Sequence, residues 1–198
     1  MKSDDPRSYS ELLTELKSAV RCAQSSAVRA INRRVIELYW SIGRTIIQRE
    51  EFESWESEVV DTISRDLLQV FPGSMAFSAD NIRRMRQFFL AYTRDYLKTA
   101  APCTDLDGLN LPEVLTYLPW RHNILLVELV QEPAHRLWYA QNAAEQGWSL
   151  KMLERQIRDG AHRQFGQVGG QPAVPSADLA REILADPFNA EFLRLIFA

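Results

Sequence analysis

The sequence contains little of what covalent cross-links, metal sites and membrane spans require. Its 198 residues include only two cysteines, Cys22 and Cys103, with no CxxC motif and no histidine cluster near either one. This usage is typical of a reducing compartment and gives no support to a structural metal. The N-terminal stretch MKSDDPRSYSELL lacks the apolar core of a signal peptide, and no segment approaches the roughly 18 apolar residues of a membrane span. We therefore expect a cytoplasmic protein that enters no membrane and carries no metal or cofactor.

Motifs for catalysis are also absent. The sequence has no GxGxxG, no Walker-type loop and no GxSxG, and its histidines, His122, His135 and His162, form neither HxxxH nor HExxH. A metal-dependent nuclease needs several carboxylates close together, often an Asp followed by Glu-x-Lys on adjoining strands. The only Glu-x-Lys, at residues 15–17, lies in a helical pattern with no room before it for such a strand. We therefore expect no enzymatic activity in this chain.

One long helix, or two nearly continuous ones, is predicted near the N-terminus. From about residue 8 to residue 50, apolar residues recur every three or four positions without an intervening proline. The stripe consists of Leu12, Leu16, Val20, Ala23, Ala27, Ile31, Val35, Leu38, Ile42 and Ile46. Its mean step is close to a heptad, which leaves two interpretations: a coiled-coil dimer seam or a long core helix. Gly43 within this pattern indicates either a close packing contact or a helix break.

A basic helix is the first candidate for nucleic-acid binding. Because the chain has a net charge of −3, nucleic acid would have to bind a local basic patch. The stretch from Phe77 to Arg94 contains four arginines, and Asp80 is its only acidic residue. Ser78 is a good N-cap, and an apolar stripe leaves the opposite face basic. The candidates for DNA contact on this helix are Asn81, Arg83, Arg84, Gln87 and Arg94.

The preceding helix ends at Pro72-Gly73, which gives the order of a helix-turn-helix. Any helical hairpin has the same order, so the order alone is weak evidence. The alternative interpretation of the basic face is the solvated outer surface of an ordinary amphipathic helix.

A second helix-turn-helix-like unit is predicted around Gly147-Trp148-Ser149. Ala143, Gly147, Ser149 and Leu153 follow a spacing shared by many such units: a small residue, a turn glycine, a capping serine and an aliphatic residue. Opposite Leu153, one helix face carries the basic residues Lys151, Arg155 and Arg158, flanked by Glu154 and Asp159. Charge therefore favours the first unit as the DNA contact, whereas turn chemistry favours the second.

A set of short motifs extends from about Ala27 to Asp159. They are Leu38-Tyr39-Trp40 with Ile42-Gly43-Arg44, Phe77-Ser78 with Asn81, Met85 and Phe88, Leu118-Pro119-Trp120 with His122, Trp138-Tyr139, Gly147-Trp148-Ser149, and Leu153 with Gln156-Ile157. Together they resemble the N-terminal domain of YhcG-type bacterial proteins, whose C-terminal part is a PD-(D/E)XK nuclease-like domain. The resemblance implies an all-helical, helix-turn-helix-like module that binds DNA or assembles the nuclease, in defence against foreign DNA.

The chain departs from this family in two respects. Arg121 and Asn123 stand where the family often has Ser and His around the Pro-Trp pair. The nuclease part is missing, although the closing DPFNAEFL resembles the join to it. The resemblance therefore does not carry nuclease activity over to this chain.

The sequence thus predicts an all-α fold, with a long N-terminal helix and a helix-turn-helix-like bundle. We expect residues 1–98 and 111–163 to form one compact domain, 164–177 a linker, and 178–198 an amphipathic tail that leads to an absent C-terminal domain or packs back. The predicted function is non-catalytic binding of double-stranded DNA. The alternative is an oligomerisation or protein–protein interaction module that assembles the nuclease. Expected partners are duplex DNA, a second copy bound through the N-terminal helix, and the C-terminal nuclease domain.

Overall fold

The computed structural model describes residues 6–53, 59–99, 109–163 and 177–196, and every regular element in these ranges is helical. In chain order the elements are α1 (Pro6–Glu53), α2 (Val59–Val70), α3 (Ala79–Thr99), the 3₁₀ helix η2 (Glu113–Tyr117), α4 (Trp120–Leu129), α5 (Pro133–Gln146), α6 (Leu150–Arg158), the 3₁₀ helix η3 (Ala161–Arg163), α7 (Ala177–Ala185) and α8 (Pro187–Ile196). The all-α prediction with a long N-terminal helix is confirmed. Cys103 and all but the last residue of the predicted linker lie outside the described residues.

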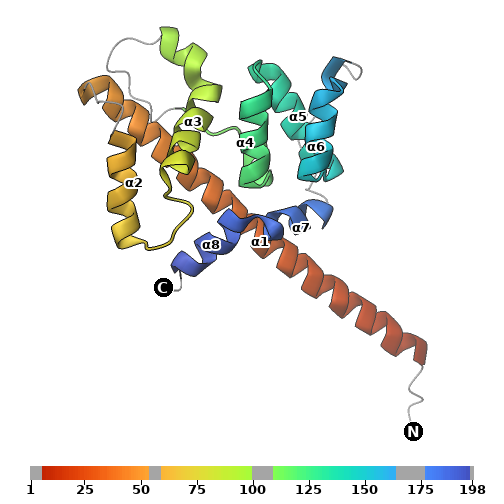
Figure 1. Ribbon diagram of the computed structural model, residues 1–198. Helices are drawn as coiled ribbons and strands as arrows, with labels where there is room; N and C mark the ends of the chain where they lie inside the picture. Colours follow the sequence, from red (N-terminus) through yellow and green to blue (C-terminus); the bar gives the residue numbers. More distant parts are fainter. Residues whose placement is uncertain (1–5, 54–58, 100–108, 164–176, 197–198) are drawn as a thin grey trace.

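Helix α1 is 48 residues long and has two dissimilar halves. The second half supplies fully buried residues such as Val35, Ile36 and Tyr39, and α3, α7 and α8 pack against it. The first half projects away from the other helices (Figure 1), and every residue from Tyr9 to Gln24 is exposed. The core-helix interpretation of the apolar stripe is therefore correct for the second half, while the dimer seam stays a prediction for the first half.

Gly43 lies where α1 crosses α3. A Cβ atom built on Gly43 would meet the carbonyl oxygen of Met85 at 2.3 Å and the Cβ of Phe89 at 3.1 Å. Both distances are shorter than an ordinary contact, so only glycine lets the two helix backbones approach this closely. Of the two interpretations of Gly43, the close packing contact is confirmed.

An aromatic cluster around Trp120 joins α1, α3 and α4. The ring of Trp120 lies edge-on to Tyr39 of α1, with ring centroids 4.8 Å apart, and to Phe88 of α3 at 5.2 Å. Edge-to-face pairs at these distances add to the stability that burial of the rings provides. Trp120 is completely buried, and its indole N–H donates to the side-chain oxygen of Asn81 at 2.8 Å. The Pro-Trp motif thus forms the centre of the core.

Helices α7 and α8 are docked on α1 by buried polar side chains. Asn32 of α1 donates to the carbonyl oxygens of Thr116 and Leu118, and it accepts a hydrogen bond from Asn189 of α8 at 3.0 Å. The carboxylate of Glu191 accepts hydrogen bonds from the residue 74–76 turn, including the Ala76 N–H at 3.0 Å. The C-terminal segment therefore packs back on the domain.

Among the helices of the described ranges, none combines the length and the apolar character needed to cross a bilayer. The division of the chain at residues 98, 111 and 163 stays a prediction.

Candidate nucleic-acid interface

The turn between α5 and α6 has the geometry that its sequence predicts. Gly147 adopts a left-handed conformation, with φ 64° and ψ 40°, and ends α5. The Ser149 side chain accepts a hydrogen bond from the Met152 N–H at 3.3 Å and caps α6. Ala143 and Leu153 are both fully buried, so a small and an aliphatic residue face the interior on either side of the turn. These contacts give a fixed path from one helix to the next.

A buried histidine attaches this turn to α4. The Nε2 of His122 lies 3.0 Å from the backbone oxygen of Trp148, which requires Nε2 to be the protonated donor. His122 is 1% exposed, and burial lowers its pKa below the ordinary value. The neutral ring is thus a structural part of the unit.

The exposed face of α6 carries Lys151, Arg155 and Arg158. Arg158 pairs with Glu154 at 2.8 Å and Arg155 with the C-cap residue Asp159 at 3.5 Å, both between residues four positions apart. The arginine side chains are 73% and 75% exposed, so each pair contributes only about 0.3–0.5 kcal/mol and is easily exchanged for another anion. Within the described part of the chain, Lys151 has no ion-pair partner. The face therefore keeps available positive charge.

The basic face of α3 is different, because acids from other helices neutralise it. Arg83 binds both carboxylate oxygens of Asp61 on α2, at 2.7 and 2.9 Å, and also contacts Asp80. Arg84 lies 3.5 Å from Glu128 of α4. A further arginine of this helix, Arg86, forms a bidentate pair with Glu50 of α1. The expectation of a locally cationic face counted acids along the chain alone, and the ion pairs with Asp61, Glu128 and Glu50 reduce the charge of this face.

Asn81 is not available for contact with DNA. It is 2% exposed, its oxygen accepts from Trp120, and its amide donates to the Ala76 carbonyl at 2.8 Å. Its role in this structure is to join the start of α3 to the aromatic core. The prediction that Asn81 contacts DNA is therefore corrected.

Gln87 and Arg94 are exposed and border a groove between α3 and the α4–α5 connection. The groove encloses about 730 Å³ and carries mixed charge, because Glu128 and Glu132 line it together with Arg94 and Arg136. Arg136 is buried there, and its guanidinium donates to the carbonyl oxygens of Ala91, Val130 and Gln131. Arg136 therefore joins α3 to the α4–α5 connection, a structural role that the sequence pattern did not reveal.

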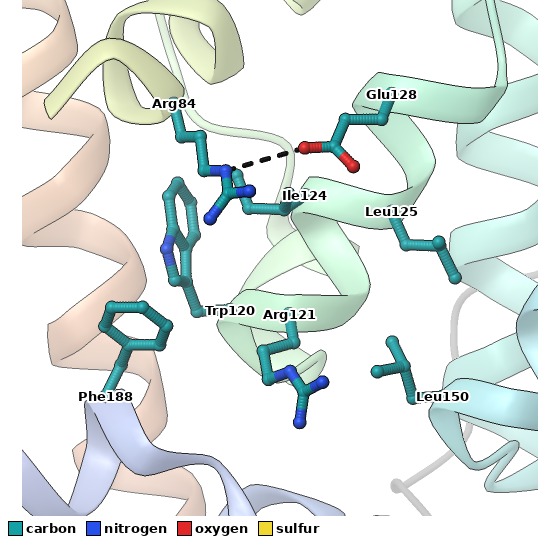
Figure 2. A pocket seen from close by; sticks show the side chains of 8 residues that line it. All are labelled: Arg84, Trp120, Arg121, Ile124, Leu125, Glu128, Leu150 and Phe188. Atoms are coloured by element: carbon teal, nitrogen blue, oxygen red, sulfur yellow. Dashed lines mark ion pairs between the residues drawn. The ribbon is translucent and has the colours of Figure 1, made fainter. Parts of the chain in front are cut away.

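A smaller pocket of about 250 Å³ lies where α3, α4, α6 and α8 meet. Figure 2 shows Arg84 and Arg121 at opposite ends of the pocket, with Trp120 along its wall and Leu150 at the start of α6. Arg84 is engaged by Glu128, as the dashed line marks. Arg121, which the sequence marked only as a departure from the family pattern, is an exposed cation beside the α6 N-terminus.

The ranges that the structure describes hold no group of three or more His, Cys, Asp or Glu side chains that could bind a metal. His135 and His162 stack with ring centroids 4.1 Å apart, and the Tyr139 hydroxyl lies 2.7 Å from Nδ1 of His162. No carboxylate is among the hydrogen-bond partners of this trio in the described residues. The three side chains tie α5 to η3.

Comparison with known proteins identifies the family. The DUF1016 N-terminal domain family matches residues 15–164, which is most of the chain. The chain belongs to this family. A relative from Escherichia coli (strain K12), named "Putative nuclease YhcG", is 23% identical over 214 residues, covering 94% of this chain and 56% of that protein. No solved structure matches.

The family assignment confirms the resemblance to YhcG-type N-terminal domains, and the word nuclease appears in the name of the relative from Escherichia coli. The chain spans about half the length of that relative. The family match begins at residue 15 and therefore includes both helix-turn-helix-like units and most of α1.

Proposed function

We propose that this chain is a non-catalytic module that binds double-stranded DNA for a nuclease-type protein, and that α6 is the helix in contact with DNA. The observation that carries the proposal is the α5–α6 unit, in which Gly147 and Ser149 fix the turn and the exposed α6 face presents three cations. A helix after such a turn is the element that helix-turn-helix proteins place in the major groove.

The ion pairs favour α6 over α3. The pairs on α6 are exposed and join residues four positions apart, so phosphate oxygens replace the carboxylates at little cost. On α3, a single guanidinium nitrogen of Arg83 donates to both carboxylate oxygens of Asp61 on α2, whereas Arg86 uses two nitrogens in a bidentate pair with Glu50 of α1. The bidentate Arg86 pair is geometrically specific, and both pairs hold an arginine of α3 against a neighbouring helix. Lys151, Arg155 and Arg158 are therefore assigned to phosphate contacts that position the module.

The test is the salt dependence of binding to a labelled duplex, measured by fluorescence anisotropy from 50 to 200 mM salt. The triple variant Lys151→Ala, Arg155→Ala, Arg158→Ala removes three cations, so its slope of log K against log salt should fall by about 2.7. The matched control removes three cations from α3, through Arg83→Ala, Arg84→Ala and Arg94→Ala, and should keep the wild-type slope. Circular dichroism checks that both variants remain folded.

Two results would overturn the proposal. If the wild-type chain does not bind the duplex at 50 mM salt, the proposal that this chain binds DNA is refuted. A slope that falls in the α3 variant and stays unchanged in the α6 variant moves the contact to α3. A cytoplasmic location and a role in defence against foreign DNA stay predictions.

A second candidate function is assembly of the nuclease-type protein, and the exposed half of α1 favours it. A row of apolar side chains in this half has no partner in the described part of the chain. Exposed apolar surface of this kind is typical of protein interaction sites.

A further inference from the structure

A groove of about 650 Å³ lies at the C-terminal end of α6, between that helix, the start of α5 and η3. Gly160, with φ 67°, follows α6 and turns the chain into η3. Arg158 belongs to the exposed cationic face of α6 and also lines this groove. Arg163 of η3 is exposed, and a Cβ atom built on Gly160 would lie 3.7 Å from its Cδ, so its side chain folds back toward the end of α6. The cationic face of α6 thus continues past its last turn into the groove.

Two histidines lie on the wall of the groove. The rings of His135 on α5 and His162 on η3 stack with their centroids 4.1 Å apart. The Nδ1 of His162 lies 2.7 Å from the hydroxyl of Tyr139, which is completely buried. In the part of the chain that the structure describes, the Nε2 of His162 has no hydrogen-bond partner. This nitrogen is therefore the one that a ligand in the groove can use.

The Tyr139 hydroxyl can bond to either protonation state of His162. It lies 2.7 Å from Nδ1 and 3.3 Å from the carbonyl oxygen of Gln156. When the ring is neutral with its proton on Nε2, the hydroxyl donates to Nδ1. When the ring is protonated, Nδ1–H donates to the hydroxyl, whose own proton is then donated to the Gln156 carbonyl. His162 can thus gain a proton while every hydrogen bond of the trio is kept.

The fixed charges that line the groove come from three elements and cancel. They are Glu132 of the α4–α5 connection, Arg158 and Asp159 of α6 and its C-cap, and Arg163 of η3. Partial burial, the neighbouring His135 ring and the charge of Arg163 lower the pKa of His162, so this ring is neutral near pH 7. The fixed charges alone give no net attraction for an anion, and a proton on His162 supplies it. A bound anion in turn favours that proton, since an opposite charge nearby favours the charged form.

Phosphate is the anion that this arrangement fits. Guanidinium groups bind phosphate through two parallel hydrogen bonds, and two of them, Arg158 and Arg163, border the groove. A protonated imidazole adds a third charged donor through Nε2.

We propose that the groove binds a phosphate group of the DNA backbone between Arg163 and the His162 ring, with uptake of one proton from solvent by His162; this inference rests on the DNA-binding function proposed above. Arg158 belongs both to the groove and to the α6 face, so a strand held by α6 brings a further phosphate to the groove. DNA and the proton then favour each other's binding by the same factor.

The first experiment measures binding to a labelled duplex by fluorescence anisotropy at about pH 7.5 and about pH 5.5, both at 50 mM salt. The wild-type affinity should be several-fold higher at the lower pH, approaching about tenfold for each unit by which binding raises the pKa of His162. His162→Gln keeps a polar side chain that cannot take up the proton, so its gain should be smaller. Circular dichroism checks that both proteins are folded at the lower pH.

The outcomes of this experiment separate the two proposals. An equal gain in wild type and His162→Gln refutes the inference and leaves DNA binding by α6 intact. No binding at either pH refutes the DNA-binding function itself.

The second experiment follows His162 in the wild-type chain by NMR titration of the imidazole signals, so it needs no variant. Adding the duplex should raise the pKa of His162. His122, which is 1% exposed and bonded to the α5–α6 turn, is the internal control and should titrate unchanged. A parallel titration with inorganic phosphate separates the two sources of phosphate: a rise with inorganic phosphate and none with the duplex overturns the assignment to DNA. No rise with either one refutes the site.

The third experiment tests Arg163 through the salt dependence of duplex binding at about pH 5.5. Arg163→Gln removes one phosphate contact, so the slope of log K against log salt should fall by about 0.9. Arg65→Gln is the matched control, because Arg65 is an exposed arginine of α2 outside the groove, and it should keep the wild-type slope. If Arg163→Gln also keeps that slope, Arg163 holds no phosphate and the inference is wrong.

Discussion

The contact at Gly43 predicts how a single methyl group affects stability. Gly43→Ala places a Cβ atom 2.3 Å from the Met85 carbonyl oxygen and 2.9 Å from its carbonyl carbon. Ordinary contacts lie at roughly 3.5 Å, so α3 must move away by about 1 Å. The obstacle is the backbone of α3, and this helix also carries the buried residues Phe88 and Phe89, so no flexible side chain can absorb the clash.

Two effects of opposite sign determine the result. Alanine is favoured over glycine inside a helix by about 1 kcal/mol. Overpacking of a well-packed core costs about 1–3 kcal/mol, and a clash with backbone belongs at the upper end of this range. We therefore expect Gly43→Ala to lower the free energy of unfolding by about 2 kcal/mol.

The assay is urea unfolding, followed by tryptophan fluorescence and far-UV circular dichroism at one fixed protein concentration. Thr45→Ala is the matched control, because Thr45 is exposed two residues further along the same helix. Its effect should stay within about 0.5 kcal/mol of wild type. If Gly43→Ala is as stable as wild type or more stable, then the close approach of α1 and α3 is refuted.

Three further predictions concern buried polar groups, all measured by the same urea assay. Asn81→Ala leaves the indole N–H of Trp120 without its acceptor and should cost about 1–3 kcal/mol, whereas an unchanged midpoint would refute this bond. Glu191→Ala removes the acceptor for two backbone N–H groups of the residue 74–76 turn and should cost a similar amount; Glu191→Gln, which keeps one acceptor oxygen, should cost less. Burial lowers the pKa of His122, so the unfolded chain binds more protons than the folded chain below about pH 6.5. Stability should therefore fall as the pH drops from 7.5 to 5.5, and His122→Gln should flatten this dependence; equal slopes in both proteins would exclude His122 as its source.

Local features of the fold could be predicted from the sequence because their causes are local. Ser78 and Ser149 cap the helices that follow them, and Gly147 adopts the left-handed conformation that its position after α5 requires. The length of α1 followed from an apolar repeat without proline. Gly43 was recognised as unusual, although only the structure shows that Met85 is its neighbour.

The charge of a surface could not be predicted in this way, because it depends on which helices are adjacent. Arg83 is paired with Asp61, which lies 22 positions away, and Arg86 with Glu50, 36 positions away. Asn81 sits in the first turn of an amphipathic helix, where a polar residue is usually solvated. Its burial follows from Trp120, 39 positions further along, which needs a hydrogen-bond acceptor in the core.

The hydrogen bond between Asn32 and Asn189 spans 157 positions and has a consequence for biosynthesis. A ribosome releases the chain from its N-terminus at about 5–20 residues per second, so Asn189 is made roughly 8–30 s after Asn32. During this interval the second half of α1 has no α8 to cover it. The side of α1 that faces α7 and α8 therefore stays open to solvent and to chaperones until those two helices are made, whereas the side that faces α3 can pack as soon as α3 has been made.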